Sequence, residues 1–344
     1  MTQSFLSGIY FLVWWCWNFL YEHRWIIPKR VNATVVSVGN LTVGGTGKTP
    51  FTIFLAKHYQ ANGYTVGIVS RGYKGNYREA VALVSDGTNV LGSATLSGDE
   101  PMMMARRLAG ATCPAGVAPL AGIPIAVSKG RYLGCQLLIE KFKVNLILLD
   151  DGFQHRRLHR DLNLLLIDTT EKNHSLLPKG MMREPLSAAK RANVVVLTRQ
   201  DGNTHDVDYP FTCPILHTSF SPVALINLQT GDSQSLSTLK GEKVLAFCGI
   251  GNPDSFLKML SDLGVNLCES IVFRDHYGYT NSDIKEIETK GKRLGVKYII
   301  TTEKDAIKIE SLSIAGIDIF ALRIEIGFKE PSTVWERHLN APLS

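Results

Sequence analysis

The sequence predicts an α/β protein, with a P-loop NTPase-like parallel-sheet domain followed by a second, smaller α/β domain. Residues 34–49 form an apolar strand that runs into a glycine-rich loop and closes on Lys48 and Thr49. After this loop, apolar strand patterns alternate with helical patterns, which is typical of a parallel sheet. Residues 244–253 again read as a strand, a glycine turn and a helix start. This second turn lacks a Lys-Thr ending, so we do not expect a second nucleotide site there.

Length and composition allow a large core and exclude several classes of protein. The chain has 344 residues, 45% of them hydrophobic, so one large or two moderate domains are expected. The net charge of +6 is modest and the basic residues are scattered, which argues against a nucleic-acid partner. Six cysteines without a C-x-x-C pair predict neither a disulfide framework nor zinc, and favour a reducing, cytosolic environment. Nothing in the sequence indicates an obligate protein partner.

Residues 1–27 are predicted to form a helix at a membrane interface. Residues 5–21 are strongly aromatic and are followed by basic residues, with no basic residue before them and no cleavage site after them, so a signal peptide is not expected. A run of about 17 residues lies at the lower limit for crossing a bilayer. Trp14, Trp15 and Trp17 prefer the headgroup boundary. We expect the helix to lie on the inner leaflet; a helix packed on the protein's own core is the alternative.

The glycine-rich loop predicts a polyphosphate site. Small residues let consecutive N–H groups turn toward one anion, and Lys48 and the following helix N-terminus add positive potential. Thr49 is expected to bind the Mg²⁺ that accompanies the nucleotide. The loop departs from the pattern G-x-x-x-x-G-K-[ST] at Thr42, where glycine is usual, and an ordinary glycine turn is the alternative. The predicted nucleotide contacts are Thr42, Val43, Gly44, Gly45, Thr46, Gly47, Lys48 and Thr49.

Three aspartates stand at positions suited to the same chemistry. An almost wholly apolar strand at residues 144–149 ends at Asp150 and Asp151, where P-loop proteins place a carboxylate near the metal ion. Adjacent side chains of a strand point to opposite sides, so the two aspartates should have different roles. A plain strand-to-turn junction is the alternative. Asp99 lies at the start of an apparent helix. From the sequence pattern alone, a role as the helix N-cap and a role as a proton acceptor are equally supported.

Two further segments carry basic residues that suit a phosphate. Arg131 follows a short strand at residues 123–127 and has the geometry to pair with phosphate bidentately, although a surface arginine need not do so. A loop at residues 177–185 carries Arg183 and Glu184.

The second half of the chain reads as a connector and another domain. Residues 213–240 lose the strand and helix alternation, so they are expected to link a P-loop domain at 28–212 to a second domain at 241–344. His276 is the acid–base candidate of this half, although a loop histidine is more often only exposed.

Several motifs in combination resemble the tetraacyldisaccharide 4′-kinase family of lipid A synthesis. The resemblance implies transfer of the ATP γ-phosphate, with Mg²⁺, to the 4′-hydroxyl of a tetraacylated glucosamine disaccharide 1-phosphate. It also implies two subdomains joined by a two-stranded linker, and a place on the cytoplasmic face of the bacterial inner membrane, where the lipid acceptor lies. The motifs are V-G-N-L-T-V-G-G-T-G-K-T-P, S-G-D-E-P, L-D-D-G-F-Q-H, L-P-K-G-M-M-R-E-P, F-R-D-H-Y and T-T-E-K-D-A-I-K.

The resemblance also implies roles for individual residues. Asp99 matches the general base and His276 its partner, which favours chemistry over a helix cap for Asp99. Asp150 and Asp151 match the magnesium-site carboxylates. Many members have a second histidine where this chain has Tyr277, so no role is carried over there. Further matches are Arg131, Arg183 and Glu184 at active-site positions and Gln154 in the D-D-G-F-Q-H motif; we predict Gln154 and Glu184 as nucleotide contacts.

A membrane-associated P-loop ATPase switch is the competing function. Its motif K-G-G-x-G-K-[ST] is similar to the loop, but its first lysine corresponds to Val43 here. A GTP-binding regulator would carry an N-K-x-D motif, which does not occur. Phosphate transfer that depends on the lipid acceptor would support the kinase, and hydrolysis without acceptor would support the switch.

Overall fold

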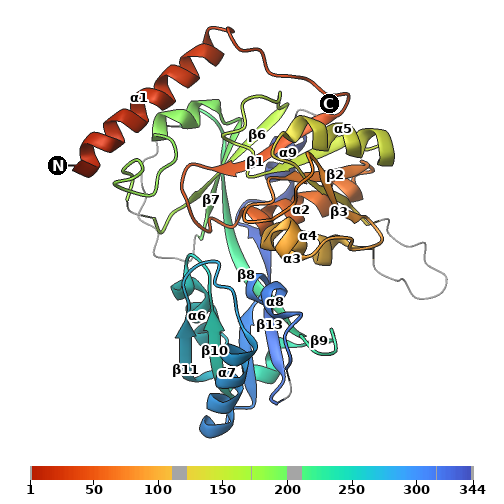
Figure 1. The fold of residues 1–344 in the computed structure, drawn as a ribbon, viewed down its shortest axis with the longest axis vertical. Helices are drawn as coiled ribbons and strands as arrows, with labels where there is room; N and C mark the ends of the chain where they lie inside the picture. The colour runs from red at the N-terminus through yellow and green to blue at the C-terminus, as the bar shows by residue number, and fades with distance from the viewer. Residues whose placement is uncertain (1, 111–121, 172, 200–210, 315, 342–344) are drawn as a thin grey trace. The chain divides into compact units, whose positions relative to one another are not determined.

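The chain forms two compact units in the computed structural model, which describes residues 2–110, 122–171, 173–199, 211–314 and 316–341. Unit 1 comprises Met1–Ser219 and Ile326–Ser344, and unit 2 comprises Phe220–Glu325. The chain passes from one unit to the other within two strands, β8 (Ile215–Asn227) and β13 (Ile319–Phe328). Figure 1 shows the elements of each unit, and the predicted α/β fold class is confirmed.

The C-terminal end of the chain belongs to unit 1, whereas the sequence predicts that all of residues 241–344 form the second domain. The last helix, α9 (Ser332–Asn340), packs there on α2 (Lys48–Ala61). The Tyr59 hydroxyl donates a hydrogen bond to the Leu339 carbonyl at 2.8 Å. The ring of Trp335 contacts Phe54, with 5.5 Å between their centroids. These contacts join segments far apart in the sequence, so a linear reading of the chain does not reveal them.

Unit 1 is built on a mostly parallel sheet with the strand order β8-β7-β6-β1-β5-β2-β4-β3. Only β3 pairs antiparallel along this path within the described residues. Most of these strands are buried along their whole length, as expected for a parallel sheet covered on both faces. The strands are β1 (Thr34–Asn40), β2 (Val66–Ser70), β3 (Ala82–Asp86), β4 (Pro124–Val127), β5 (Leu146–Asp150), β6 (Leu162–Asp168) and β7 (Val194–Thr198).

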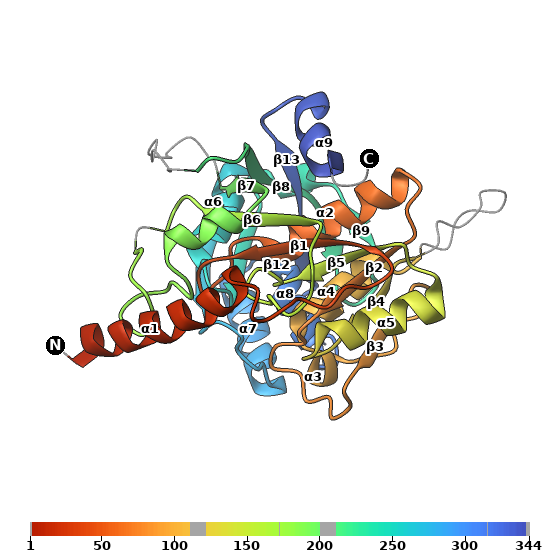
Figure 2. The same cartoon turned by 90° about the horizontal axis from the view of Figure 1, so that it is seen from above.

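Helices pack against this sheet (Figure 2). α5 packs through Cys135 and Leu138 on strand residues Val69 and Ile147. β1 lies between β5 and β6, with Val38 opposite Asp150 in the parallel register. The loop after β1 and the aspartates after β5 therefore emerge side by side. The remaining helices of the unit are α3 (Ala94–Ser97), α4 (Asp99–Leu108), α5 (Arg131–Phe142) and the 3₁₀ helix η1 (Leu186–Arg191).

The N-terminal helix α1 (Thr2–Glu22) has one side on unit 1 and one side exposed. Trp14 packs against a cluster that contains Leu41 and Phe153, and Asn18 is only 5% exposed. Phe5 and Val13 on the other side are 70% and 64% exposed. Within the described residues, no helix combines the length and apolar character needed to cross a membrane.

Unit 2 contains a parallel sheet with the strand order β11-β10-β12-β13, and β9 pairs antiparallel with β8. Alternate residues of β10 enter two different clusters: Val244 and Ala246 pack with Phe256, whereas Leu245 and Phe247 pack with Ile284. This alternation is the two-residue period of a strand buried on both faces. The elements are β9 (Ser233–Gln234), η2 (Leu236–Leu239), β10 (Lys243–Cys248), α6 (Pro253–Asp262), β11 (Asn266–Val272), α7 (Asn281–Leu294), β12 (Tyr298–Thr302) and α8 (Glu303–Ile309).

Candidate nucleotide and phosphate site

The glycine-rich loop lies between the end of β1 and the first turn of α2. Gly44 and Gly47 have φ angles of 129° and 83°, which side chains rarely adopt, so glycine is required at both. Among the described residues outside the immediate chain neighbours, a Cβ added to Gly44 or Gly45 would have no heavy atom within 4 Å. The backbone of the loop is therefore open to a ligand at the helix N-terminus, where an anion is favoured.

A second segment runs alongside this loop and brings Arg183 to it. The amide of Val43 donates to the Met181 carbonyl, and the amide of Arg183 donates to the Leu41 carbonyl, both at 2.7 Å. These bonds hold residues 181–183 antiparallel to the start of the loop. The predicted residue Arg183 thus reaches the phosphate site through backbone pairing that its sequence pattern does not indicate.

Lys48, Asp151 and Arg183 form one charged cluster beside the loop. The Lys48 Nζ lies 3.2 Å from the Asn40 Oδ1 and 3.6 Å from the Asp151 Oδ1. Asp151 also accepts hydrogen bonds from Arg183 at 2.9 and 3.1 Å. Burial alone would raise the pKa of Asp151, but the charges of Lys48 and Arg183 outweigh it and lower the pKa to about 2. Asp151 is therefore ionised at neutral pH.

Asp150 has different surroundings, although it is the adjacent residue. It is 1% exposed, and its carboxylate accepts hydrogen bonds from Ser70 at 3.0 Å and Thr52 at 3.5 Å. Burial, followed by the charges of Glu100 and Asp151, raises the pKa of Asp150 to about 7. Asp151 has a φ of 51°, in the left-handed region, so the chain turns directly after Asp150. A cation arriving near Asp150 would favour its ionised form.

Arg131 is a buried cation held next to both aspartates. It is 3% exposed and donates to the carbonyls of Ser128, Asp150 and Asp151 at 3.1, 3.4 and 3.4 Å. Its Nε has no hydrogen-bond partner within the described part of the chain. Burial lowers the pKa of Arg131, and the nearby aspartates act against this. The guanidinium is thus oriented by backbone carbonyls and lies close to the aspartate pair.

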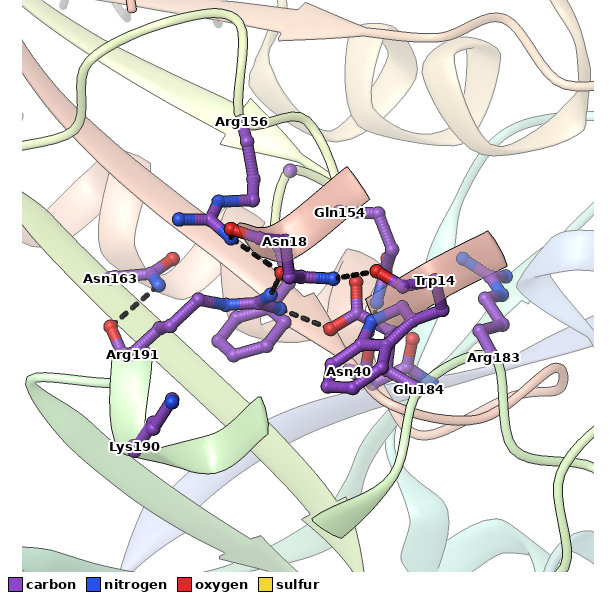
Figure 3. A network of polar contacts seen from close by, with 12 residues as sticks. Trp14, Asn18, Asn40, Gln154, Arg156, Asn163, Arg183, Glu184, Lys190 and Arg191 are labelled. Carbon is purple, nitrogen blue, oxygen red and sulfur yellow. Dashed lines mark hydrogen bonds and ion pairs between the residues drawn. The ribbon is translucent and has the colours of Figure 1, made fainter. Parts of the chain in front are cut away.

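Gln154 and Glu184 contact the surroundings of the loop. The Gln154 side chain donates to the Asn40 carbonyl at 2.8 Å. The Glu184 carboxylate, 5% exposed, pairs with Arg191 (Figure 3). Gln154 thus binds the last residue of β1, and Glu184 directly follows Arg183, whose amide pairs with the start of the loop.

Two residues that hold the loop, Asn40 and Arg199, were not predicted from the sequence. Asn40 pairs with Lys48, as described above, and its Nδ2 donates to the Thr42 hydroxyl at 3.2 Å. Arg199 donates to the Gly45 carbonyl at 2.7 Å and pairs with Asp168. Their positions at strand ends were a partial indication, because residues that follow parallel strands gather at one edge of the sheet. Arg199 directly follows β7.

The predicted acid–base residues lie in different units. Asp99 is the first residue of α4 in unit 1, and Gly98 is the N-cap of this helix, so Asp99 does not serve as the cap. His276 lies in unit 2, where its Nε2 is 3.2 Å from the Lys304 Nζ and 3.9 Å from a carboxylate oxygen of Asp275. Tyr277 donates to Asp283 at 3.3 Å. The pairing of Asp99 with His276 remains a prediction.

The residues present suit a metal ion that arrives with phosphates. No group of three or more His, Cys, Asp or Glu side chains is arranged to hold a metal in the described ranges, so a site made only of protein ligands is not found there. Mg²⁺ in nucleotide sites needs only one or two carboxylates, with phosphate and water as further ligands. Thr49 and the pair Asp150 and Asp151 offer hard oxygen ligands beside the open loop. The donor set fits this kind of site.

Comparisons with known proteins agree on one family. A family model described as tetraacyldisaccharide-1-P 4′-kinase (LpxK) matches residues 3–342. The tetraacyldisaccharide 4′-kinase of Syntrophus aciditrophicus is 36% identical over 91% of this chain and 85% of its own length. That of Geobacter metallireducens is 37% identical over 88% and 86%. A solved structure of Aquifex aeolicus LpxK in complex with ATP covers 100% of both chains, with a TM-score of 0.80 and 32% identity.

Proposed function

The chain belongs to the tetraacyldisaccharide-1-P 4′-kinase family, and from this premise we propose how its own residues carry out phosphate transfer. It is an ATP-dependent kinase that phosphorylates the 4′-hydroxyl of tetraacyldisaccharide 1-phosphate in lipid A biosynthesis. The single observation that carries the mechanism is the convergence of the open loop, Lys48, Arg183 and two dissimilar aspartates at one edge of unit 1. The ATPase switch is not favoured, because Val43 replaces its signature lysine.

Residues 42–49 bind the ATP phosphates in this proposal. Lys48 is buried yet only weakly paired with Asp151 at 3.6 Å, so its ammonium is available to reach a phosphate oxygen. Arg183 and Arg131 add positive charge on the same side of the sheet. In phosphoryl transfer, such positioning and charge neutralisation supply most of the catalysis.

Thr49, Asp150 and Asp151 would hold Mg²⁺. When bound, Mg²⁺ would supply positive charge that offsets the negative charge of the phosphates. Asp151 is already ionised. Asp150 has a raised pKa, so it would lose its proton when a cation binds beside it. Gln154 and Glu184 complete the nucleotide site as predicted contacts.

Asp99 is proposed as the general base that accepts the proton of the 4′-hydroxyl, with His276 of unit 2 as its partner. Asp99 opens a helix immediately after a glycine with a φ of 91°, where a carboxylate is presented beyond the helix end. A positioned base typically contributes about a hundredfold or more to the rate.

The exposed side of α1 is proposed to bind the cytoplasmic face of the inner membrane, where the lipid acceptor resides. Phe5, Leu12, Val13 and Trp15 are each at least 49% exposed on this side. Basic residues follow within the next turns of the chain. Apolar area together with nearby positive charge is typical of an interfacial helix on an anionic leaflet.

A radiolabelled ATP assay with the disaccharide acceptor in detergent tests this function. We expect acceptor-dependent transfer by the wild type, a loss of roughly a hundredfold or more for Lys48→Ala, and near wild-type transfer for Lys57→Ala, an exposed lysine of the same helix. Hydrolysis of ATP without acceptor at the same rate would support the ATPase switch instead. An unaffected Lys48→Ala variant would overturn the assignment of the phosphate site.

A further inference from the structure

The inner side of α1 carries polar side chains that contact the segment between residues 176 and 191. The Ser7 hydroxyl donates to the Leu176 carbonyl at 3.1 Å. The Tyr10 hydroxyl donates to the Arg183 carbonyl at 2.7 Å. A helix that served only as a membrane anchor would not need specific polar contacts on this side. These bonds reach the segment that carries Arg183.

Asn18 is more deeply buried than Ser7 and Tyr10, the other two residues of α1 that make these polar contacts. Its side chain is 5% exposed, and its Oδ1 accepts hydrogen bonds from Arg156 at 2.5 Å and from Arg191 at 2.6 Å. Its Nδ2 donates to the Trp14 carbonyl one turn earlier at 2.8 Å, which fixes the orientation of the amide. Figure 3 shows the amide between the two guanidinium groups. Bonds with a charged donor are stronger than those between neutral groups.

Arg191 transmits this contact to the phosphate site. Its guanidinium pairs with Glu184, and it also lies over the ring of Phe153, 4.7 Å from the centroid. Glu184 is adjacent in sequence to Arg183, which binds Asp151, and Phe153 lies two residues after Asp151. Two links therefore connect the buried amide of α1 with the residues around Asp151.

The charges in this region explain why an amide oxygen is needed. Arg156 and Arg191 donate to one oxygen, and the half-buried Arg160 is close enough for their charges to affect it. Burial first, and then the charges of Arg191 and Arg156, lowers the pKa of Arg160 to about 10. Without the Asn18 oxygen, the guanidinium groups of Arg156 and Arg191 would face each other with no shared acceptor, and Glu184 would be a nearby carboxylate. Arg191 would then be free to turn away from Glu184 and Phe153.

We propose that Asn18 is a positioning residue for phosphate transfer, which holds Arg191 and through it the Arg183–Glu184 segment. α1 is therefore a part of the kinase scaffold as well as a membrane-binding helix. Tyr10 acts in the same sense through the carbonyl of Arg183. This inference rests on the proposed function only in that phosphate transfer is its readout.

The test compares four substitutions in α1, made in the whole chain; the fourth is Trp15→Ala. Asn18→Ala removes the acceptor, Asn18→Asp keeps two acceptor oxygens for the arginines, and Gln3→Ala is a control that removes an exposed polar side chain from the same helix. For each protein, kcat and KM are measured in detergent micelles, the Tm is recorded, and binding to anionic phospholipid vesicles is measured by co-sedimentation.

We expect Asn18→Ala to lower kcat about tenfold or more, because small displacements at a reacting centre have large effects on the rate. Vesicle binding should stay within about twofold of the wild type, because the exposed side of α1 is unchanged. Asn18→Asp should recover most of the kcat, and Gln3→Ala should match the wild type. Trp15→Ala, on the exposed side, should lower vesicle binding.

Three outcomes would overturn the inference: an unchanged kcat for Asn18→Ala, an Asn18→Asp variant as slow as Asn18→Ala, or a loss of kcat that merely follows a loss of vesicle binding. If Asn18→Ala does not fold, Tyr10→Phe decides the question, since it removes only one hydroxyl and should lower kcat about twofold to fivefold. An unchanged kcat in Tyr10→Phe would then contradict the inference. Failure of the wild type to phosphorylate the acceptor would instead refute the proposed function.

Discussion

Both units contain a strand that runs into a glycine turn and a helix, but the two turns are filled in opposite ways. In unit 1, the loop after β1 is open at Gly44 and Gly45, and the Lys48 ammonium contacts the neutral amide oxygen of Asn40 at 3.2 Å and the Asp151 carboxylate at 3.6 Å. In unit 2, the amide of Gly249 is occupied by the carboxylate of Asp305 at 2.9 Å. Asp305 is fully buried and also accepts from Lys308 at 2.6 Å and Thr302 at 2.8 Å.

This difference between the two turns shows that a glycine turn after a strand is not by itself an anion site. The backbone amide must be unclaimed, and the nearby cation must be free to leave its partner. In unit 2 the anion is supplied by the protein itself, as the side chain of Asp305. In unit 1 the corresponding space is open to a ligand. We expect four experiments to separate the open turn from the filled one, beginning with the one that should have the strongest effect.

Asp305→Ala should cost unit 2 about 3–5 kcal/mol of stability, because it leaves Lys308 and the Gly249 amide buried without their shared partner. Denaturant unfolding should show this loss, whereas Asp262→Ala, an exposed aspartate of α6, should have no measurable effect. A small loss in Asp305→Ala would mean that the turn of unit 2 is not stabilised by its own carboxylate.

Asp99→Ala and His276→Ala should each lower kcat by roughly a hundredfold or more, since they would remove the general base and its partner. Steady-state kinetics with the lipid acceptor in detergent would measure this. Such a loss in His276→Ala would mean that unit 2 takes part in the reaction through this histidine. Wild-type turnover in both variants would refute the dyad.

The stability of unit 1 should depend on pH through Asp150. Its pKa is about 7 in the folded protein and 3.8 for the ordinary group, so the folded state holds a proton that the unfolded state has lost between these values. Stability should therefore fall as pH rises from about 4 to 7 and level off above 7. Asp151 acts in the opposite direction at lower pH, since its pKa of about 2 contributes stability that is lost as pH falls from about 4 toward 2.

Thermal melts of the ligand-free protein between pH 5 and 8 would measure the contribution of Asp150. Asp150→Asn should flatten this profile and raise the relative stability near pH 8. An identical pH profile in the variant would show that the carboxyl group is not the source of the dependence.

Gly45→Ala and Gly249→Ala should have different, smaller effects. At Gly45 the new methyl group would enter the open space of the loop, so the KM for ATP should rise about tenfold with little change in Tm. At Gly249 it would lie 3.1 Å from the Tyr279 hydroxyl and 3.2 Å from the Arg274 carbonyl, so the Tm should fall by a few degrees. Equal effects in the two variants would remove the distinction between an open and a filled turn.

Much of unit 1 was predictable because its signals are local. The apolar run before Asp150, the loop ending in Lys48 and the alternation of strands and helices each lie within a few residues of the feature that they specify. The resemblance of six short motifs to one family is confirmed by the family model over residues 3–342 and by a relative that matches 91% of the chain. The roles of the individual site residues still depend on the experiments described above.

The contacts that hold these motifs in place were not predictable in the same way. Asn40 and Arg199 have no special sequence pattern, yet they bind Lys48 and the Gly45 carbonyl. The return of α9 to unit 1 depends on Tyr59 and Leu339, which are 280 residues apart. Such pairs become visible only when the chain is folded.

Residue order alone specifies a strand, a glycine-rich loop that ends in Lys48 and Thr49, and a pair of aspartates at another strand end, because glycine conformation and strand periodicity act over a few residues. Which turn stays open, and which residues the N-terminal helix contacts, depend on contacts between segments that are distant in the sequence. Asn18 and Arg191 meet across 173 residues of chain. Burial then gives their hydrogen bond a weight that an exposed asparagine would not have.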